Sequence, residues 1–118
     1  MFSYDGVSFL FCGDMEREAE QDVLKSGQNI KADVFKLNHH GSRTSNTNKF
    51  IEAIKPRFCV LEAGKYNSYG HPHKKVLNTL KDNGVKKLFR TDKNGNIMFY
   101  VENSKLYHKV DKEGRGWN

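Results

Sequence analysis

The stretch "ADVFKLNHHGSRTS" (residues 32–45) runs from an apolar segment into two adjacent histidines, a glycine and several hydroxyl side chains. Its first six residues predict a short strand. That strand would deliver His39 and His40 to the point where it ends. Taken alone, the paired histidines are equally consistent with a solvated loop and with a metal or substrate site. The choice between these two interpretations depends on the rest of the sequence.

Short apolar runs alternate with helical patterns on both sides of this stretch. We expect strands within residues 6–13, 32–37, 57–64, 85–91, 97–102 and 104–110, and helices within residues 15–27, 48–56 and 74–84. The run at 6–13 is nearly continuously apolar, which is typical of a strand covered on both faces. This order predicts an α/β fold with a mainly parallel sheet. The Asn94-Gly95 pair predicts a hairpin turn, after which residues 97–102 would pair antiparallel with the preceding strand.

Each predicted helix has an apolar face that should turn toward the sheet. The residues expected on these faces are Met15, Ala19 and Val23 in the first helix, Phe50, Ile51 and Ile54 in the second, and Val76, Leu77 and Leu80 in the third. We expect one domain over residues 1–118, with a frayed tail at 111–118.

Composition excludes some classes of protein. The chain has 118 residues, of which 36% are hydrophobic and 29% charged, and no run approaches the roughly 20 apolar residues of a membrane helix. The N-terminus lacks the pattern of a signal peptide. We therefore expect no membrane insertion by this chain, and a cytoplasmic location if it stands alone. Cys12 and Cys59 lie in apolar runs without CxxC spacing, so they fit buried thiols better than a disulfide or a metal site.

The net charge of +6 favours anionic partners such as nucleic acid or phosphate esters. Many lysines stand between Lys74 and Lys112. A lysine-rich solvated surface is the plainer interpretation, because no known nucleic-acid reader motif is present. Charge alone does not settle the partner.

Metal-binding residue types follow three of the predicted strands. Asp14, the pair His39-His40 and the loop that holds His71 and His73 each come after a strand. In a parallel sheet the carboxyl ends of the strands form one ligand-binding edge, so these groups should line the same edge. Imidazole and carboxylate are ligand types preferred by zinc and similar cations. The shared placement favours a site over a solvated loop.

Each member of this group also has a purely structural explanation. Asp14 could cap the helix that follows it. The segment from His71 to His73 could simply begin a helix, because it contains a proline. The hydroxyl residues Ser42, Thr44, Ser45 and Thr47 could all be turn residues.

Four stretches closely resemble a known family in order and spacing. They are "FLFCGDMEREAEQDVL" (9–24), "ADVFKLNHHGSRTS" (32–45), "PRFCVLEAGKYNSYGHPHKKVL" (56–77) and "FRTDKNGNI" (89–97). They resemble the metallo-β-lactamase-fold hydrolases, in particular the soluble domain of the ComEC-type competence and DNA-uptake proteins. The resemblance implies the C-terminal half of an αββα sandwich, an α/β fold with a mixed sheet and helices on one face.

The resemblance also assigns roles to individual residues. It implies that Asp14 bridges two metal ions and that His40 is a metal ligand, with His39 as the alternative ligand. It places His39 beside the substrate and His71 at a phosphate or the substrate, both as candidate catalytic residues. Candidate substrate-binding residues are Ser42, Arg43 and His73.

The chemistry implied by the resemblance is metal-assisted hydrolysis. The implied cofactor is a divalent metal, Zn²⁺ first and Mn²⁺ as the alternative, which would activate water and stabilise developing charge. A phosphodiester is the implied substrate, with nucleic acid as the natural source given the family and the net charge. The alternative function is a non-catalytic remnant or a module that binds nucleic acid or another anion.

One part of the family pattern is missing. The family's main metal motif, HxHxDH, belongs to the N-terminal half of its fold, and this chain has no histidine before His39. Asp14 and one histidine are too few ligands for a tight dinuclear site. A half-sandwich should also expose one sheet face, so we expect a homo-oligomer or a complement supplied by a missing N-terminal half.

Overall fold

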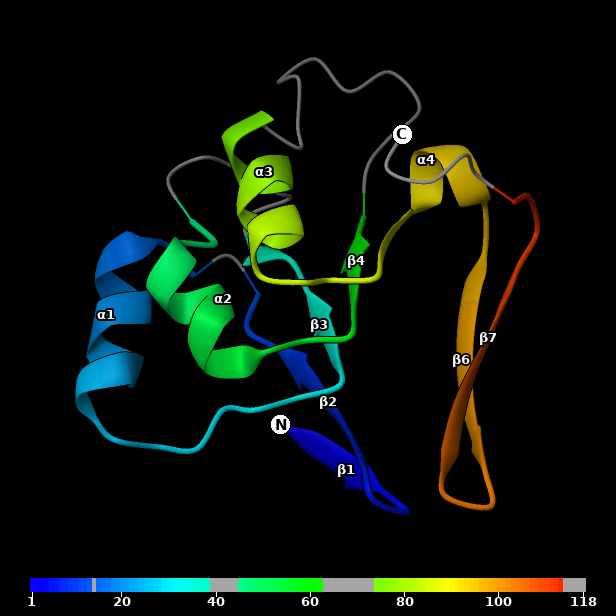
Figure 1. Cartoon of the computed structure of the whole chain (residues 1–118), viewed down its shortest axis with the longest axis horizontal. Helices are drawn as coiled ribbons and strands as arrows, with labels where there is room; N and C mark the ends of the chain where they lie inside the picture. Colours follow the sequence, from blue (N-terminus) through cyan, green and yellow to red (C-terminus); the bar gives the residue numbers. More distant parts are fainter. Residues whose placement is uncertain (14, 39–44, 63–73, 114–118) are drawn as a thin grey trace.

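Parallel strands form the centre of the fold, which a computed structural model describes for residues 1–13, 15–38, 45–62 and 74–113 (Figure 1). The main sheet has the order β1-β2-β3-β4-β5. Its strands are Phe2–Tyr4 (β1), Val7–Phe11 (β2), Val34–Lys36 (β3), Phe58–Leu61 (β4) and Lys87–Arg90 (β5). Strands β2 to β5 are parallel, which confirms the predicted sheet, and β1 pairs antiparallel with β2. β1 is an additional strand that the sequence pattern did not predict.

Three helices cover one face of this sheet (Figure 1). They are Arg17–Lys25 (α1), Asn48–Ile54 (α2) and Lys74–Asp82 (α3), and they follow β2, β3 and β4 in turn. Crossovers between parallel strands are almost always right-handed. Since these strands are adjacent in both sequence and space, every crossover places its helix on the same side. The prediction of a mixed sheet with helices on one face is confirmed.

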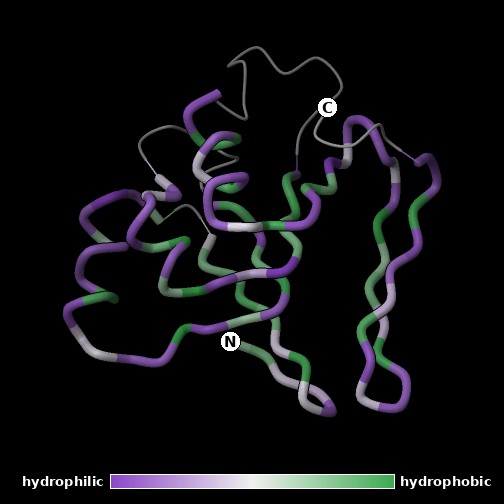
Figure 2. Tube along the Cα trace, in the orientation of Figure 1, coloured by the Kyte–Doolittle hydropathy of each residue, from purple (hydrophilic) through white to green (hydrophobic). Residues whose placement is uncertain are grey.

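The main core lies between the helices and this sheet face. Alternate strand residues point into it, namely Leu10, Phe35, Leu37, Cys59, Leu61 and Leu88. From the helices come Phe50, Ile51, Ile54, Val76 and Leu80, all buried as expected, with Val23, Leu24 and Leu77 partly buried against them. Figure 2 shows the same contrast between apolar strands and helices that are largely hydrophilic.

The inner face of α1 differs from the prediction in one residue. Ala19 is exposed, whereas the next residue, Glu20, is fully buried. The buried stripe is therefore Glu20, Val23 and Leu24, with i, i+3, i+4 spacing. Ala19 fits an apolar pattern, but hydrogen-bond partners for the Glu20 carboxylate come from outside the helix and outweigh that pattern.

The predicted pairing of residues 97–102 with the preceding strand is wrong. Residues Thr91–Asn94 form a short helix (α4), and β6 (Ile97–Glu102) pairs instead with β7 (Lys105–Val110) in a separate sheet. The side chain of Asn94 accepts a hydrogen bond from the Arg90 amide at 2.8 Å and donates one to the carbonyl of Lys112 at 2.9 Å. These bonds connect Asn94 in α4 to the end of β5 and to the segment after β7, in place of the expected turn. The predicted last strand within 104–110 is confirmed as β7.

The β6–β7 hairpin packs against the second face of the main sheet. Phe99 contacts the rings of Phe9, Phe58 and Phe89, with ring centroids 5.4–6.4 Å apart. Ser104 in the hairpin turn donates two hydrogen bonds to Asp5 between β1 and β2, but the hairpin does not cover all of these two strands. Large apolar side chains are exposed there, at Phe2 (58%), Tyr4 (60%) and Phe11 (60%). β2 is therefore not covered on both faces along its whole length, while the expected open sheet face is present in part.

The cysteines agree with the sequence prediction, whereas the C-terminal segment agrees with it only in part. Cys59 is buried, Cys12 is half-buried and both are free thiols, as expected. The backbone amides of Asp111 and Lys112 donate to the carbonyls of Asn96 and Asn94, and Glu113 forms an ion pair with Lys87. Residues 111–113 of the expected tail therefore contact the rest of the fold, and residues 114–118 lie outside the described part. Within the described residues, no helix is long and apolar enough to cross a bilayer.

Candidate active-site edge

Three adjacent parallel strands end at the same edge of the main sheet. Phe11, Lys36 and Val60 are neighbours across β2, β3 and β4. Neighbouring strands lie about 4.8 Å apart, so the three chain segments leave the sheet within about 10 Å of one another. The predicted site segments begin only a few residues beyond these strand ends. The parallel order of these strand ends, on which the predicted convergence depends, is confirmed, and the convergence of the site residues stays a prediction.

The predicted site residues themselves lie outside the described residues. This holds for all seven: Asp14, His39, His40, Ser42, Arg43, His71 and His73. Their roles as ligands, catalytic groups or substrate contacts therefore stay predictions. The described residues on either side of them show how the edge is built.

The two ends of the histidine-containing segment are joined by a reciprocal pair of asparagines. The backbone amide of Asn38 donates to Oδ1 of Asn46 at 2.7 Å, and Nδ2 of Asn46 donates to the carbonyl of Asn38 at 2.9 Å. Both side chains are buried. The pair fixes the points at which the chain leaves β3 and returns toward α2.

A buried carboxylate from α1 holds the same two points. One oxygen of Glu20 accepts from Nδ2 of Asn38 at 2.9 Å and from the backbone amide of Asn46 at 2.5 Å. Its other oxygen accepts from both the amide and the hydroxyl of Thr47, each at 2.9 Å. A buried carboxylate is costly unless its lone pairs are satisfied, and here four donors satisfy them. Glu20 therefore connects the helix after β2 to both ends of the segment after β3.

This network is the part of the candidate site that sequence reasoning missed. From the sequence, Glu20 fits the acidic residues that suit the start of a helix. A signal was present, because Glu20 stands three and four residues before Val23 and Leu24 and so shares their face. Its partners Asn38, Asn46 and Thr47 carry no local pattern that points to a distant helix.

Two buried polar atoms beside this network remain unsatisfied. Oδ1 of Asn38 and Oγ of Ser45 have no hydrogen-bond partner among the described residues. Both residues directly flank the segment 39–44. Buried polar atoms in proteins are nearly always hydrogen-bonded, so unsatisfied atoms are expected where a ligand or another chain segment supplies the partner.

Two cavities adjoin this edge, one on each face of the sheet. The first, about 530 Å³, lies among α1, α2 and α3 on the helical face. The second, about 680 Å³, lies between the main sheet and the hairpin, where Phe11, Lys36 and Glu62 line it near the strand ends. Lys36 and Glu62 form an ion pair there at 3.6 Å.

The described residues do not form a metal centre by themselves. No group of three or more His, Cys, Asp or Glu side chains lies within ligand distance in that part of the chain. Cys12 and Cys59 are poor candidates for ligands, because burial raises the pKa of both thiols above the ordinary value and keeps them protonated. Among the predicted site residues, Asp14 and His40 have side chains of a type that holds a metal.

Comparison with known proteins relates the chain to competence proteins. It is 45% identical over 98 residues to ComE operon protein 3 of Bacillus subtilis (strain 168), covering 83% of this chain and 12% of that protein. It is 37% identical over 95 residues to competence protein ComA of Neisseria gonorrhoeae, covering 80% of this chain and 14% of that one. Recombination protein 2 of Haemophilus influenzae is 32% identical over 73 residues, which cover 62% of this chain and 9% of that protein.

The chain thus spans about an eighth of the length of the first two relatives. No protein-family model matches it. The similarity covers most of the chain. The chain is therefore similar to a part of each of these competence proteins.

Proposed function

We propose that this chain is part of a metal-dependent phosphodiester hydrolase of the metallo-β-lactamase superfamily, acting on nucleic acid in DNA uptake. The observation that carries the proposal is the edge at which the parallel strands β2, β3 and β4 end side by side. Asp14, His39-His40 and His71 follow these three strands in the sequence, which supports a shared site there. The names of the competence relatives support a connection with DNA.

In this proposal Asp14 and His40 hold the metal. Bound Zn²⁺ or Mn²⁺ would activate water and stabilise the charge that develops on the phosphate. His39 and His71 would exchange protons with the substrate, because imidazole titrates near neutral pH. Ser42, Arg43 and His73 would contact the phosphate oxygens, since cationic and hydroxyl donors suit them.

The described structure supports a positioning role for the residues around the edge. Glu20 and the asparagine pair fix both ends of the 39–44 segment, and catalytic groups need such fixed positions. Asp14 and His40 are only two ligands, so further ligands must come from a second segment or a second chain. We propose a homo-oligomer or a complementing N-terminal half, and the exposed apolar side chains at Phe2, Tyr4 and Phe11 support that proposal.

A phosphodiesterase assay tests this function. Purified protein would be assayed with a bis-aryl phosphodiester and Zn²⁺ or Mn²⁺, and its metal content would be measured in parallel. We expect Asp14→Ala and His40→Ala each to lower both the metal content and the rate by about 100-fold or more, whereas Asp22→Ala on the exposed side of α1 should change neither. A rate that is absent, or unchanged in both site variants, would overturn the proposal.

A second candidate function is binding without hydrolysis. The observation that favours it is the first cavity, which is lined by three cationic side chains and by no acidic one among the described residues. Binding of nucleic acid with no metal-dependent turnover in the same assay would select this alternative.

A further inference from the structure

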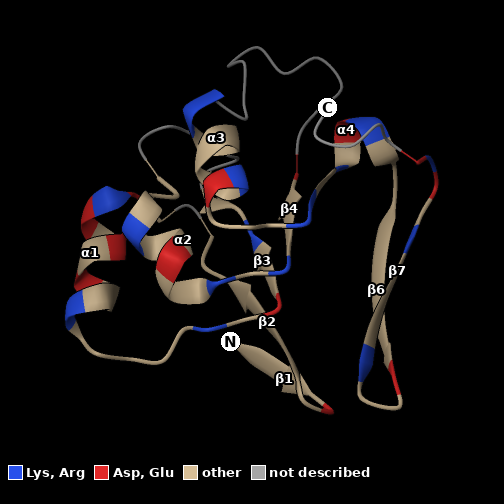
Figure 3. Ribbon diagram, viewed as in Figure 1, with Lys and Arg blue, Asp and Glu red and all other residues tan. Residues whose placement is uncertain are grey.

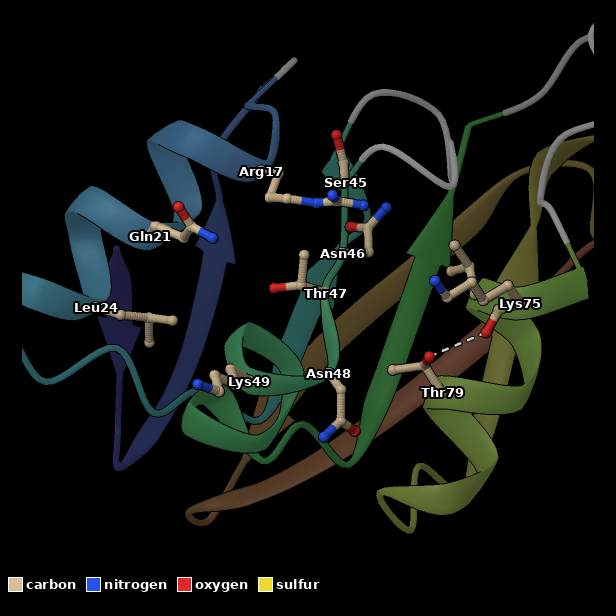
Figure 4. A pocket seen from close by; sticks show the side chains of 11 residues that line it. Arg17, Gln21, Leu24, Ser45, Asn46, Thr47, Asn48, Lys49, Lys75 and Thr79 are labelled. Atoms are coloured by element: carbon tan, nitrogen blue, oxygen red, sulfur yellow. Dashed lines mark hydrogen bonds between the residues drawn. The ribbon is translucent and has the colours of Figure 1, made fainter.

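We propose that the cavity among α1, α2 and α3 binds the phosphodiester backbone of a nucleic-acid strand next to the candidate active-site edge. Figure 4 shows side chains from α1, from residues 45–49 and from the start of α3 lining this cavity. The proposal deepens the proposed function and rests on it for the identity of the anion as nucleic acid. The cavity, of about 530 Å³, lies in the size range of ligand sites in proteins.

Charge is the first argument for an anionic ligand. Arg17, Lys49 and Lys75 come from three different helices and line the same cavity. All three are exposed, and the described lining residues include no aspartate or glutamate. Cationic side chains in a concave surface concentrate their positive potential, which attracts phosphate groups.

One carboxylate does bind to two lining residues, and its effect is limited. Glu20 accepts hydrogen bonds from the amide of Asn46 and from the amide and hydroxyl of Thr47. Its charge is already stabilised by four donors. Cationic side chains therefore outnumber this carboxylate among the described residues in and beside the cavity.

The start of α3 is a second argument. Lys74 and Lys75 both stand in its first turn, which contains no acidic residue. The amino end of a helix carries a partial positive charge, so lysines there are unfavourable for the helix itself. A bound phosphate would offset this repulsion. Figure 3 shows basic residues at the beginning of α1, α2 and α3, on the side where the three helices approach the strand ends.

An unsatisfied donor is a third, independent argument. Ser45 lines the cavity and is 2% exposed, and its buried hydroxyl has no hydrogen-bond partner among the described residues. A hydroxyl in such a position can donate to a phosphate oxygen at little cost, because it gives up no existing bond.

The position of the cavity connects it to the chemistry of the edge. Ser45 directly follows the segment 39–44, and Lys74 directly follows the segment 63–73. A strand with one phosphate in the cavity would therefore place a neighbouring phosphodiester close to the segments that carry the predicted catalytic histidines. The cavity would hold the substrate strand beside the bond to be cleaved.

Strand binding in the presence of EDTA tests the proposal without any hydrolysis. The probe is a fluorescein-labelled single-stranded DNA of about 12 nucleotides, and anisotropy gives its Kd over a range of salt concentrations. The test variant is Arg17→Gln/Lys49→Gln/Lys75→Gln. The matched control, Lys93→Gln/Lys105→Gln/Lys109→Gln, removes the same charge from exposed positions on α4 and β7.

We expect the cavity variant to bind at least about tenfold more weakly at about 50 mM salt. Its salt slope should fall by about 2, or about 0.7 for each phosphate that a cationic side chain no longer neutralises. The control should bind less than about threefold more weakly than the wild type. Circular dichroism would verify that both variants are folded. Equal weakening of the two variants would overturn the proposal, because binding would then depend on net charge alone.

The outcome separates this inference from the proposed hydrolase. Selective loss of binding in the cavity variant supports the inference even if the wild-type protein hydrolyses nothing. Metal-dependent hydrolysis together with unchanged binding by the cavity variant would overturn the inference and leave the hydrolase standing.

Discussion

Among single residues, Glu20 has the largest structural role near the candidate site. Its carboxylate is fully buried and accepts four hydrogen bonds from Asn38, Asn46 and Thr47. Helical spacing indicates only that Glu20 shares a face with Val23 and Leu24. No local pattern indicates its partners, which lie 18 to 27 residues away. By contrast Phe50, Ile51 and Ile54 were predicted correctly as core, since helical spacing alone places them on one face.

Replacing Glu20 by glutamine tests the network. The amide of glutamine puts a donor group where two existing donors need an acceptor, so Glu20→Gln should lower the free energy of unfolding by about 2–3 kcal/mol. Urea denaturation measures this value. Glu18→Gln, an exposed change of equal charge in the same turn, should cost less than about 0.5 kcal/mol. Similar losses in the two variants would show that the network contributes little.

The buried thiol of Cys59 should make the free energy of unfolding fall as the pH rises in the alkaline range. Burial raises its pKa well above the ordinary value of 9.0, so the thiol stays protonated in the folded chain and ionises in the unfolded chain. This contribution is fully present below that value and is lost as the pH rises above it. Near pH 10 the loss should be about 1.4 kcal/mol.

Comparison with Cys59→Ala separates the contribution of this thiol to the unfolding free energy from the contributions of other titrating groups. The fall in unfolding free energy from neutral pH to about pH 10 should be smaller in Cys59→Ala than in the wild type by that same 1.4 kcal/mol or so. Parallel curves for the two proteins would contradict the assignment.

Among the elements, α4 and the hairpin depart most from what the sequence predicts. The parallel strands and their helices follow from local patterns, because apolar runs and helical spacing are both short-range signals. The pairing of β6 does not, since it depends on bonds from Asn94 to Lys112, 18 residues away. The true hairpin turn lies at Asn103 and Ser104, whose positive φ angles of 50° and 63° suit a two-residue turn.

Gly95 lies between α4 and β6, where the structure differs from the sequence prediction. Its φ is +72°, and an added Cβ would lie 2.9 Å from Cβ and Oδ2 of Asp111. Asp111 in turn accepts from the Asn96 amide at 2.9 Å. Gly95→Ala should therefore combine backbone strain with a steric clash and lower the unfolding free energy by about 2–4 kcal/mol.

Gly84→Ala is the matched control for that substitution. Gly84 has a similar φ of +74°, but nothing lies within 4 Å of an added Cβ, so only the backbone term of about 1 kcal/mol should appear. Urea unfolding of both variants gives the comparison. A loss in Gly95→Ala no greater than that in Gly84→Ala would show that the contact with Asp111 is unimportant.

For the whole molecule, the two faces of the main sheet differ in how they are covered. Helices cover one face, whereas the hairpin covers only part of the other and leaves Phe2, Tyr4 and Phe11 exposed. The sequence predicted this open face only through the family resemblance, since composition does not show which strands lack cover. The site residues beyond the strand ends stay predictions for the same reason: they depend on the resemblance.

The open face predicts self-association of the isolated chain. Light scattering after size exclusion should show a mass that rises with protein concentration. Phe2→Ser/Phe11→Ser should weaken association by about tenfold or more, because it removes apolar area from the contact. The control Met98→Ser/Tyr100→Ser alters exposed residues on the outer side of the hairpin and should have little effect. A stable monomer at all concentrations would contradict the prediction.

At the centre of the proposed function, the segments that follow β2, β3 and β4 would form a metal-dependent hydrolytic site. The most direct measurement is the metal-dependent rate of phosphodiester hydrolysis in Asp14→Asn beside Asp22→Asn, two variants with the same change of charge. We predict a loss of about 100-fold or more, with loss of bound metal, in the first variant only. Equal rates and equal metal content in the two variants would contradict the account.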